Sequence, residues 1–297
     1  MPELPEVEVV RRGLDAHVVG STFSAVEVLH PRAVRGNDVD LAEVLPGLTI
    51  TGTDRRGKFL WLTLSDGAAL LVHLRMSGQM LVGAPGLVNS PHLRIRAQLS
   101  KPDPGPGASS STIQELAFVD QRTFGSWQYV PLTPPVLGNT EHGAGRPVPA
   151  TIPHIAPDPF EPDFDPVATA RKIRTKKVAA KTILLDQSVV SGIGSIYADE
   201  AMWAAGVKPT RKGKALRQRD AVALLEESRA VMARALEAGG TSFDSLYVNV
   251  NGASGYFSRS LNAYGQAGKP CARCGTPITR TVVNGRSSYY CPTCQIH

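Results

Sequence analysis

The sequence predicts an α+β protein: a β-sandwich flanked by an N-terminal helix, then a helical domain, then a small C-terminal zinc ribbon. Three observations support this fold class. Apolar residues recur at helical spacing near the N-terminus, and short runs of β-branched and aromatic residues follow them. Beyond residue 166 the apolar period is helical again. All four cysteines lie in the terminal stretch from Cys271 to Cys294.

The first domain begins with a helix whose apolar face is formed by Val7, Val10, Leu14 and Val18. Pro5 suits the first turn of this helix. Seven runs with strand composition follow, separated by Gly, Pro and Asp turns. These runs are FSAVEVL (23–29), LTITGT (48–53), KFLWLTL (58–64), AALLVHL (68–74), LRIRAQL (93–99), IQELAFV (113–119) and SWQYVPL (126–132). They predict a two-layer sandwich, and KPDPGPGASSS (101–111) indicates a flexible insertion on its surface.

A proline-rich stretch at residues 131–166 marks the domain boundary. Four helices are expected after it, and Gly239-Gly240 is expected to cap the last of them. The four helices are residues 166–175, 178–188, 195–205 and 215–238.

Two segments of this helical half suit an anionic partner. The run RKIRTKK (171–177) carries five basic residues, which fits either a solvated helix face or a nucleic-acid surface. The turn SGIGS (191–195) opens a helix, where free backbone N–H groups suit an anion such as a DNA phosphate. A lone Gly-x-Gly is weak evidence by itself.

The cysteines form two C-x2-C pairs. The pairs are Cys271 with Cys274 and Cys291 with Cys294. Each pair offers two thiolates from one tight turn, which is the ligand arrangement of tetrahedral zinc sites. ITRTVV and SSYY between the pairs predict a hairpin that turns at Asn284-Gly285. Disulfides or reduced structural thiols are the alternatives, and the lack of a secretory signal disfavours disulfides. We expect one structural Zn2+, because four thiolates leave no open position for a substrate.

The composition limits the function classes. The chain has 297 residues, 42% of them hydrophobic, and no apolar run approaches the roughly 18 residues of a membrane helix. The N-terminus lacks signal-peptide features, so we expect a cytoplasmic protein with no membrane contact. With 32 basic and 26 acidic residues, the net charge of +6 suits a polyanionic partner, although many proteins that bind no nucleic acid have such a charge.

The opening MPELPEVE places a proline directly after the initiator methionine, with Glu3 and Glu6 close behind. Removal of Met1 turns Pro2 into an N-terminal secondary amine. An amine that attacks a sugar C1′ displaces the base and leaves a cationic iminium (Schiff-base) link. Glu3 is then placed to move protons at the sugar ring oxygen, and Glu6 to orient the N-terminus or a water. The plainer interpretation is a proline-rich helix start with surface acids.

Several motifs, taken in order along nearly the whole chain, resemble one family. They are MPELPEVE, RRGKFLWL, HLRMSGQM, DQRTFG, GIGSIYADE, GYF with LNAYG, and RSSYYCPTCQ. In these motifs the chain is similar to the bacterial formamidopyrimidine-DNA glycosylases of the Fpg/Nei family. The resemblance implies an N-terminal β-sandwich, a helix-two-turn-helix domain and a zinc finger. It also implies a bifunctional enzyme of base excision repair that excises oxidised purines (8-oxoguanine, formamidopyrimidines) and then nicks the abasic strand by β,δ-elimination.

The resemblance assigns catalytic roles by position in the motifs. It implies that Pro2 is the Schiff-base nucleophile and Glu3 the proton donor and acceptor. It further implies that Lys58 is the acid of the β-elimination. Arg286, on the zinc hairpin, is implied to contact a phosphate and to act in the δ-elimination.

The same resemblance implies a set of DNA contacts. The set is Glu6, Met76, His92, Arg122, Phe124, Lys176 and Ser195. Met76 fills the space that a flipped nucleotide leaves, Phe124 wedges between bases, and Arg122 donates to the orphaned cytosine. The segment TSFDSLYVNVNGASGYF (241–257) matches a loop that covers the everted purine.

From these assignments we expect four parts and one class of partner. The parts are a catalytic domain at residues 1–131, a linker at 132–165, the helix-two-turn-helix domain at 166–262 and the zinc finger at 263–297. The partner is double-stranded DNA with oxidised bases or abasic sites, bound by a monomer associated with the nucleoid.

Some residues depart from the family pattern, and two other functions remain open. Ser195 stands where the family usually has Asn, and Gln266 where it usually has Arg. An endonuclease VIII type, which prefers oxidised pyrimidines, is disfavoured by Leu4 and Phe124. A zinc-ribbon protein that only binds DNA has no need of Pro2 and the acid beside it.

Overall fold

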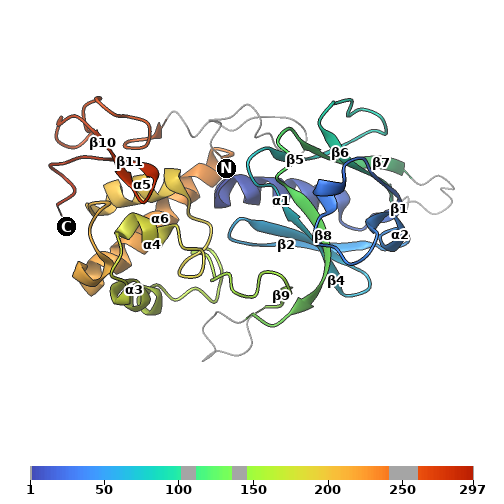
Figure 1. The fold of residues 1–297 in the computed structure, drawn as a ribbon, viewed down its shortest axis with the longest axis horizontal. Helices are drawn as coiled ribbons and strands as arrows, with labels where there is room; N and C mark the ends of the chain where they lie inside the picture. Colours follow the sequence, from blue (N-terminus) through green and yellow to red (C-terminus); the bar gives the residue numbers. More distant parts are fainter. Residues whose placement is uncertain (1, 102–111, 136–145, 241–259, 297) are drawn as a thin grey trace. The chain divides into compact units, whose positions relative to one another are not determined.

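The computed structural model describes residues 2–101, 112–135, 146–240 and 260–296 (Figure 1). Contacts within the chain divide it into two compact units. The first unit comprises residues 1–133, 147–153 and 239–255, and the second comprises the rest. Met1, nearly all of the expected insertion at 101–111 and the expected lesion-covering loop at 241–257 lie outside the described residues.

Helix α1 (Leu4–Val18) opens the first unit. Val7, Leu14 and Val18 are fully buried and Val10 is 6% exposed, so the apolar face expected from the sequence is confirmed. These residues join one hydrophobic cluster with side chains from both sheets of the unit. The helix is thus held by packing against the sandwich, which fixes the place of its N-terminus.

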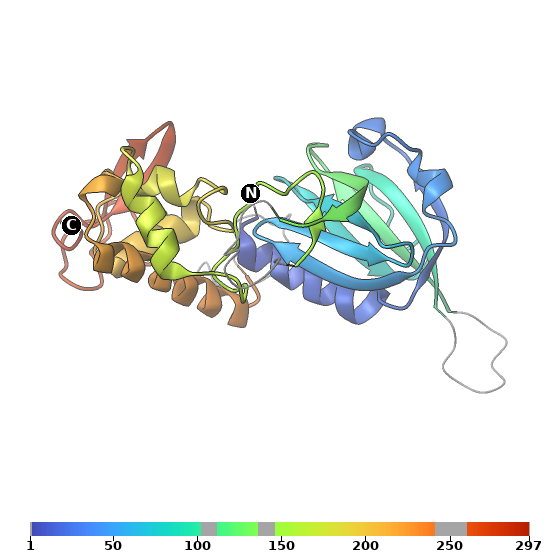
Figure 2. The same ribbon diagram turned by 90° about the horizontal axis from the view of Figure 1, so that it is seen from below.

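Two antiparallel sheets form the rest of the first unit (Figures 1 and 2). One sheet has the order β1-β6-β7-β5 and the other the order β2-β3-β4-β8-β9. Phe118 of the first sheet and Trp127 of the second are both buried, with ring centroids 6.0 Å apart. This common core confirms the two-layer sandwich. The strands are β1 (Thr22–Val28), β2 (Ile50–Arg56), β3 (Phe59–Leu64), β4 (Ala68–His73), β5 (Gly78–Gly83), β6 (Leu93–Lys101), β7 (Thr112–Asp120), β8 (Ser126–Thr133) and β9 (Val148–Pro149); the short helices η1 (Pro31–Val34) and α2 (Leu41–Val44) lie between β1 and β2.

Two of these strands were not expected from composition. Strand β5 begins and ends with glycine, which in sequence suggests turns rather than a strand. Gly78 is needed for close approach, because a Cβ there would lie 2.6 Å from Leu74 O and 3.0 Å from the Phe118 ring. Strand β9 is a two-residue pairing with β8 inside the proline-rich stretch.

The second unit begins with helices whose ends follow their capping residues. Helix α3 (Pro166–Thr175) is capped by Asp165, which accepts from the N–H groups of Val167 and Ala168. Helix α5 (Ser195–Ala205) ends at Gly206, whose φ of +70° suits glycine. Both helices have the bounds expected from the sequence. Helix α6 (Gln218–Glu237) starts three residues later than expected, after the short helix η3 (Gly213–Ala215).

The helix expected at 178–188 is wrong in length, because only Ala180–Leu184 (α4) is helical. The residues before it pair with a neighbouring strand-like segment, and Gly213 N donates to Val178 O at 3.0 Å. After it, Asp186 accepts from the backbone and side chain of Ser188, which forms a turn instead of a further helical turn.

The C-terminal hairpin agrees with the expected zinc ribbon. Strands β10 (Thr279–Val283) and β11 (Arg286–Tyr290) pair antiparallel around Asn284 and Gly285. Both turn residues have positive φ, +48° and +75°, as a two-residue hairpin turn of the I′ type requires.

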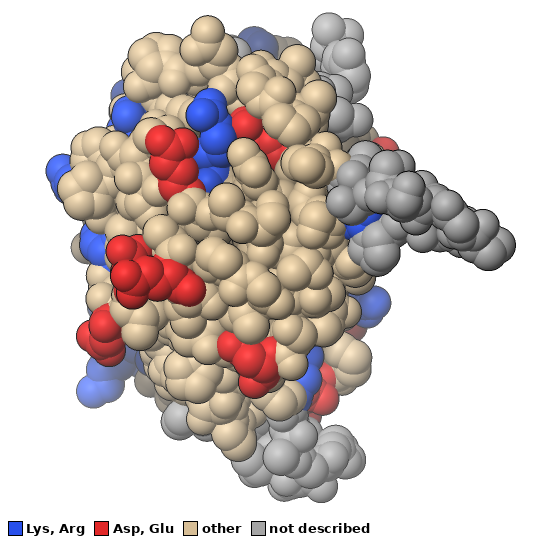
Figure 3. Space-filling view, turned by 90° about the vertical axis from the view of Figure 1, so that its right-hand side faces the viewer, with Lys and Arg blue, Asp and Glu red and all other residues tan. Residues whose placement is uncertain are grey.

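One end of the first unit is shown in Figure 3, where acidic and basic side chains are interspersed among uncharged residues. This face does not offer the continuous basic surface that a polyanion attracts. Among the described residues, no helix combines the length and apolar character that a transmembrane span demands.

Candidate active site and nucleic-acid interface

The N-terminus is held by a capping box at the start of α1. Glu3 accepts from the backbone N–H of Glu6 through its side chain, and Glu3 N donates to Glu6 Oε2 at 2.8 Å. Pro2 is buried, and the two carboxyl groups belong to residues that are 3% and 8% exposed. A Cβ on Gly240 would lie 3.6 Å from Glu6 Cγ, so the chain passes close to this acid. Pro2 is therefore fixed two residues before the first residue of the helix, next to the buried carboxylate of Glu3.

Glu8, the third acid of the opening, has a structural role. It accepts from Arg11 Nε at 2.9 Å, from Arg12 Nε at 2.8 Å and from Arg55 Nε at 3.1 Å. Burial raises the pKa of Glu8, but the three guanidinium groups outweigh burial and lower this pKa to about 2. Glu8 is thus a fixed negative charge that joins α1 to strand β2.

Lys58 lies just after the turn between β2 and β3. Gly57 in this turn has a φ of +57°, which favours glycine. Arg55, the partner of Glu8, also donates through Nη1 to Gly57 O at 3.0 Å. Lys58 is 7% exposed. The ion pair between Arg55 and Glu8 therefore fixes the turn that carries Lys58 relative to helix α1, which follows Pro2, within the first unit.

Met76, Arg122 and Phe124 are brought together by two neighbouring loops, β4–β5 and β7–β8. Arg122 Nη1 donates to Met76 Sδ at 3.6 Å. Met76 and Phe124 are 38% and 42% exposed, so neither is a core residue. Large apolar side chains that stand out in this way suit insertion between bases.

Three arginines that were not among the expected DNA contacts surround these side chains. A cavity of about 310 Å³ is lined by Arg32, Arg35, Arg75, Met76 and Phe124. Arg35 donates to the carbonyls of Arg32 at 2.7 Å, Gly125 at 3.1 Å and Phe124. Burial, and then the charges of its arginine neighbours, lower the pKa of Arg35, which indicates a strongly positive site. In the sequence, Arg32 and Arg35 stand in HPRAVRG, and Arg75 directly precedes Met76 in the motif HLRMSGQM.

His73 is a further residue that sequence reasoning missed. Its ring packs edge-on against Phe59 with centroids 4.4 Å apart, and its Nδ1 accepts from Arg75 N at 3.1 Å. Desolvation, and then the charges of Arg75, Lys58 and Arg35, lower the pKa of His73 to about 3. His73 is therefore neutral at physiological pH.

We expect His73 to make the protein sensitive to acid. A lowered pKa in the folded state means that its contribution is complete above about 6.5, the unfolded value, and is lost as pH falls towards 3. The loss is at most ~1.4 kcal/mol per pH unit in this window, and smaller here because the ring is partly exposed. His73→Asn, which keeps an acceptor for Arg75 N, should flatten the change in urea midpoint between pH 7.5 and pH 5.

The exposed His154 offers a matched control. His154→Asn should leave the pH dependence of the urea midpoint as it is in the wild type. Equal slopes for wild type and His73→Asn would contradict the lowered pKa.

The turn at residues 191–195 presents the start of α5 in the second unit. Gly192 has a φ of +89°, and its N–H donates to Gln187 Oε1 at 2.9 Å. Gln187 Nε2 in turn donates to Ile193 O at 3.0 Å. Ser195 is the first residue of α5 and is partly exposed, so it lies where backbone N–H groups and the helix dipole favour an anion.

The remaining expected contacts lie on the two units separately. His92, on the first unit, is half-buried, and its Nδ1 is 3.4 Å from Arg94 Nη2. Lys176, on the second, has a 38% exposed side chain, and its Nζ lies 3.8 Å from Asp186 Oδ2. Arg286 is exposed at the first position of β11.

The four cysteines converge as a metal centre requires. Their Sγ atoms lie within 4.8 Å of one another, and no disulfide joins them. Tetrahedral zinc with Zn–S bonds of about 2.3 Å places sulfurs roughly 3.8 Å apart, so the cluster fits the ion. The ligands would be Cys271, Cys274, Cys291 and Cys294. Four thiolates make this a structural site.

A buried ion pair joins the zinc hairpin to the helices of the second unit. Lys181 Nζ, fully buried, donates to Asp199 Oδ1 at 2.8 Å and to Ser287 O at 2.6 Å. Asp199 also accepts from Ser288 Oγ at 2.7 Å and from Tyr289 N at 2.9 Å. Because Arg286 directly precedes these residues, the pair fixes the strand that carries it.

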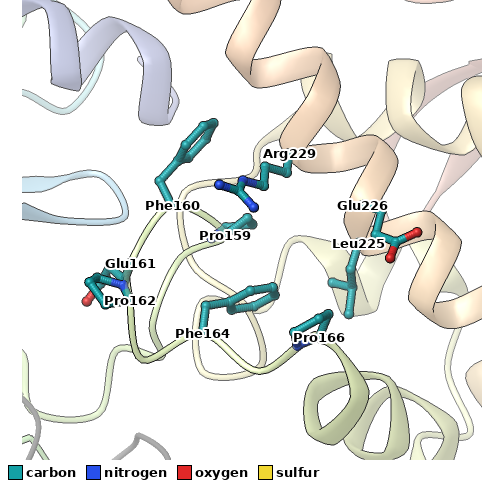
Figure 4. A pocket seen from close by; sticks show the side chains of 9 residues that line it. All are labelled: Pro159, Phe160, Glu161, Pro162, Phe164, Pro166, Leu225, Glu226 and Arg229. Carbon is teal, nitrogen blue, oxygen red and sulfur yellow. The ribbon is translucent and has the colours of Figure 1, made fainter.

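Another cavity in the second unit, of about 360 Å³, contains none of the expected site residues (Figure 4). Prolines and phenylalanines of residues 159–166 form one side, and Arg229 lies over the Phe160 ring at 5.8 Å. We see no nucleophile with an adjacent base among its lining residues, so it is not the candidate active site.

Three family models match the chain. They are the formamidopyrimidine-DNA glycosylase N-terminal domain at residues 1–127, the formamidopyrimidine-DNA glycosylase H2TH domain at 155–246, and the zinc finger found in FPG and IleRS at 268–296.

Full-length relatives and solved structures agree with these matches. Formamidopyrimidine-DNA glycosylases of Corynebacterium urealyticum and Thermobifida fusca are 56% and 52% identical to the chain, covering 99% of it and 99% and 97% of their own lengths. The complex of Lactococcus lactis Fpg with DNA containing an abasic site has a TM-score of 0.81 at 30% identity, over 99% of this chain and 100% of that one. A complex of MutM with DNA containing carbocyclic 8-oxo-G also has a TM-score of 0.81 at 30% identity, over 100% of both chains.

Proposed function

Since this chain belongs to the formamidopyrimidine-DNA glycosylase family, we propose that its N-terminal proline carries out the glycosylase reaction. The protein is a DNA glycosylase of base excision repair that holds one structural zinc ion. The observation that carries the proposal is the capping box of Glu3 and Glu6, which holds Pro2 in a buried and fixed position. The substrate class is duplex DNA with oxidised purines such as 8-oxoguanine.

The first step replaces the base by the protein. After loss of Met1, the lone pair of Pro2 N forms a bond to C1′ while the glycosidic C1′–N bond breaks, and its electron pair leaves with the base. Glu3, beside this amine, accepts the N–H proton that bond formation leaves on Pro2 N and donates a proton to the sugar ring oxygen as the C1′–O bond breaks, and the departing base takes a proton from water. Opening of the ring leaves a cationic iminium between Pro2 and C1′.

The later steps cut the strand. The iminium acidifies the C2′ protons, and loss of one of them expels the 3′ phosphate in a β-elimination. Lys58, whose turn is tied to α1 through Arg55 and Glu8, is the acid near this phosphate. Arg286 contacts phosphate from the zinc hairpin and acts in the δ-elimination of the 5′ side.

The other expected residues hold a bent duplex with one nucleotide out of the stack. Eversion costs a few kcal/mol, and Met76, Arg122 and Phe124 offset this cost by filling the vacated space. Phosphates are held by His92, Lys176 and the N–H groups near Ser195. Glu6 orients the N-terminus.

Each part of the chain has its own role in this proposal. Residues 1–131 carry the chemistry, 132–165 form a linker, 166–262 are the helix-two-turn-helix domain and 263–297 the zinc finger. We place the enzyme in the cytoplasm with the nucleoid DNA, where it acts as a monomer.

The substrate class is tested by trapping the iminium with borohydride. A duplex with 8-oxoguanine opposite cytosine should form a covalent adduct, mapped by mass spectrometry to Pro2, at least about 10-fold faster than a thymine-glycol duplex. Faster trapping on thymine glycol would favour the endonuclease VIII type. Tight binding of either duplex without an adduct would indicate a protein that only binds DNA.

A further inference from the structure

The two loops that carry Met76, Arg122 and Phe124 are joined at both ends. Each loop crosses from one sheet of the sandwich to the other. The register pairs His73 with Ser126 in one sheet and Gly78 with Asp120 in the other. Loops 74–77 and 121–125 therefore lie next to each other at both ends.

One buried carboxylate, Asp120, bonds to both loops. It accepts from Ser77 Oγ on the first loop through Oδ1. On the second loop it accepts from Arg122 N at 3.2 Å through Oδ1 and from Gly125 N at 2.7 Å through Oδ2. Ser77 Oγ also accepts from Arg122 N at 3.0 Å, which closes the network. Asp120 is fully buried, so water does not compete for these bonds.

The backbone beside each inserted side chain is strained. Arg75, directly before Met76, has a φ of +53°, and Thr123, directly before Phe124, has a φ of +54°. Non-glycine residues are unfavourable in this region, and a β-branched threonine is among the least suited to it. Such a conformation persists only where surrounding bonds enforce it.

We propose that Asp120 is a positioning residue that locks these two loops into one rigid probe, so that Met76, Arg122 and Phe124 enter the duplex together. The bonds of Asp120 hold Arg75 and Thr123 in their strained conformation before DNA arrives. Because the loops are then already ordered in the free protein, no conformational entropy is lost in ordering them when the three side chains enter the DNA. This inference rests on the proposed function of the same site.

The test compares two trapping substrates. A duplex with 8-oxoguanine opposite cytosine requires eversion of a stacked, paired base, whereas an abasic-site duplex does not. Asp120→Asn places an NH2 group against N–H donors and breaks the network. We expect it to slow trapping on the 8-oxoguanine duplex by about 10-fold or more, and on the abasic duplex by less than about threefold. Ser77→Ala, a milder change, should shift the same ratio in the same direction.

Glu115→Gln is the matched control. Glu115 lies on the same strand as Asp120, is 2% exposed, and accepts from Gly86 N and pairs with Arg96 instead of bonding to the loops. Its substitution removes a buried charge and should leave the ratio of the two rates unchanged.

The outcomes separate the two proposals. An unchanged ratio of the two trapping rates in Asp120→Asn, whether both rates fall equally or neither falls, would overturn the role of Asp120, and so would an unchanged ratio in Ser77→Ala. Failure of the wild type to trap on the abasic duplex would instead overturn the proposed function.

Discussion

Substitution of Pro2 by glycine should lower the rate of borohydride trapping on the 8-oxoguanine duplex by on the order of 10-fold or more, since the primary amine left there gives a neutral imine that must be protonated before it becomes cationic. Glycine keeps a primary amine at the same place but loses the ring that makes the iminium cationic from the start. Affinity for an uncleavable abasic-analogue duplex, measured by fluorescence anisotropy, should change by no more than about threefold, because Pro2 is not a phosphate contact.

A second variant isolates the amine from the ring. An uncleaved Gly-Ser extension before Pro2 preserves proline but converts its nitrogen to a tertiary amide. This variant should form no adduct, and the intact mass of the wild type should show that Met1 is absent. A wild type that retains Met1 and still forms the adduct at full rate would show that a different residue is the nucleophile.

The fold was largely accessible from the sequence because its signals are local. Seven strands have apolar and β-branched runs, and α3 and α5 have clear caps, so composition and turn residues sufficed for them. Strand β5 was missed because its glycine serves a contact with Phe118, which is 40 residues away in sequence. Helix α4 is shorter than expected for a similar reason, because Ala179, just before it, pairs with Lys212, which is distant in sequence.

Residues of the candidate site could be predicted from the sequence only where they belong to a recognisable motif. Pro2, Glu3 and the cysteines stand in patterns that the chemistry itself demands. Arg35, His73 and Asp120 act through partners that the fold brings close from other segments, and no spacing in the sequence indicates such contacts. Glu8 differs from the other opening acids only through Arg55, which lies 47 residues further along the chain.

Loss of zinc should abolish DNA binding while most of the protein stays folded. The hydrophobic cluster of the finger is small, with Ile278 and the buried Cys271 and Cys291 against Trp203 and Tyr289. Structural zinc contributes an apparent ~10 kcal/mol or more to such a module, far more than this cluster supplies. Cys291→Ser should therefore unfold the hairpin and release Arg286.

The rest of the second unit should tolerate this loss. When the hairpin unfolds, Lys181 and Asp199 lose their hydrogen bonds to the hairpin residues Ser287, Ser288 and Tyr289. Water then reaches both charged groups, so neither remains as an unpaired charge in the interior. The sandwich has its own core and should keep its thermal transition.

We expect Cys291→Ser to bind no stoichiometric zinc and to bind an abasic-analogue duplex at least about 100-fold more weakly, since both the phosphate contact of Arg286 and the fixed hairpin are lost. Far-UV circular dichroism should fall only slightly. Thr293→Ala, an exposed neighbour of the second cysteine pair whose side chain bonds only to Thr276 among the described residues, should match the wild type in zinc content and affinity. Global unfolding of Cys291→Ser at 25 °C would show that the finger supports the whole chain, and unchanged DNA binding would remove the hairpin from the interface.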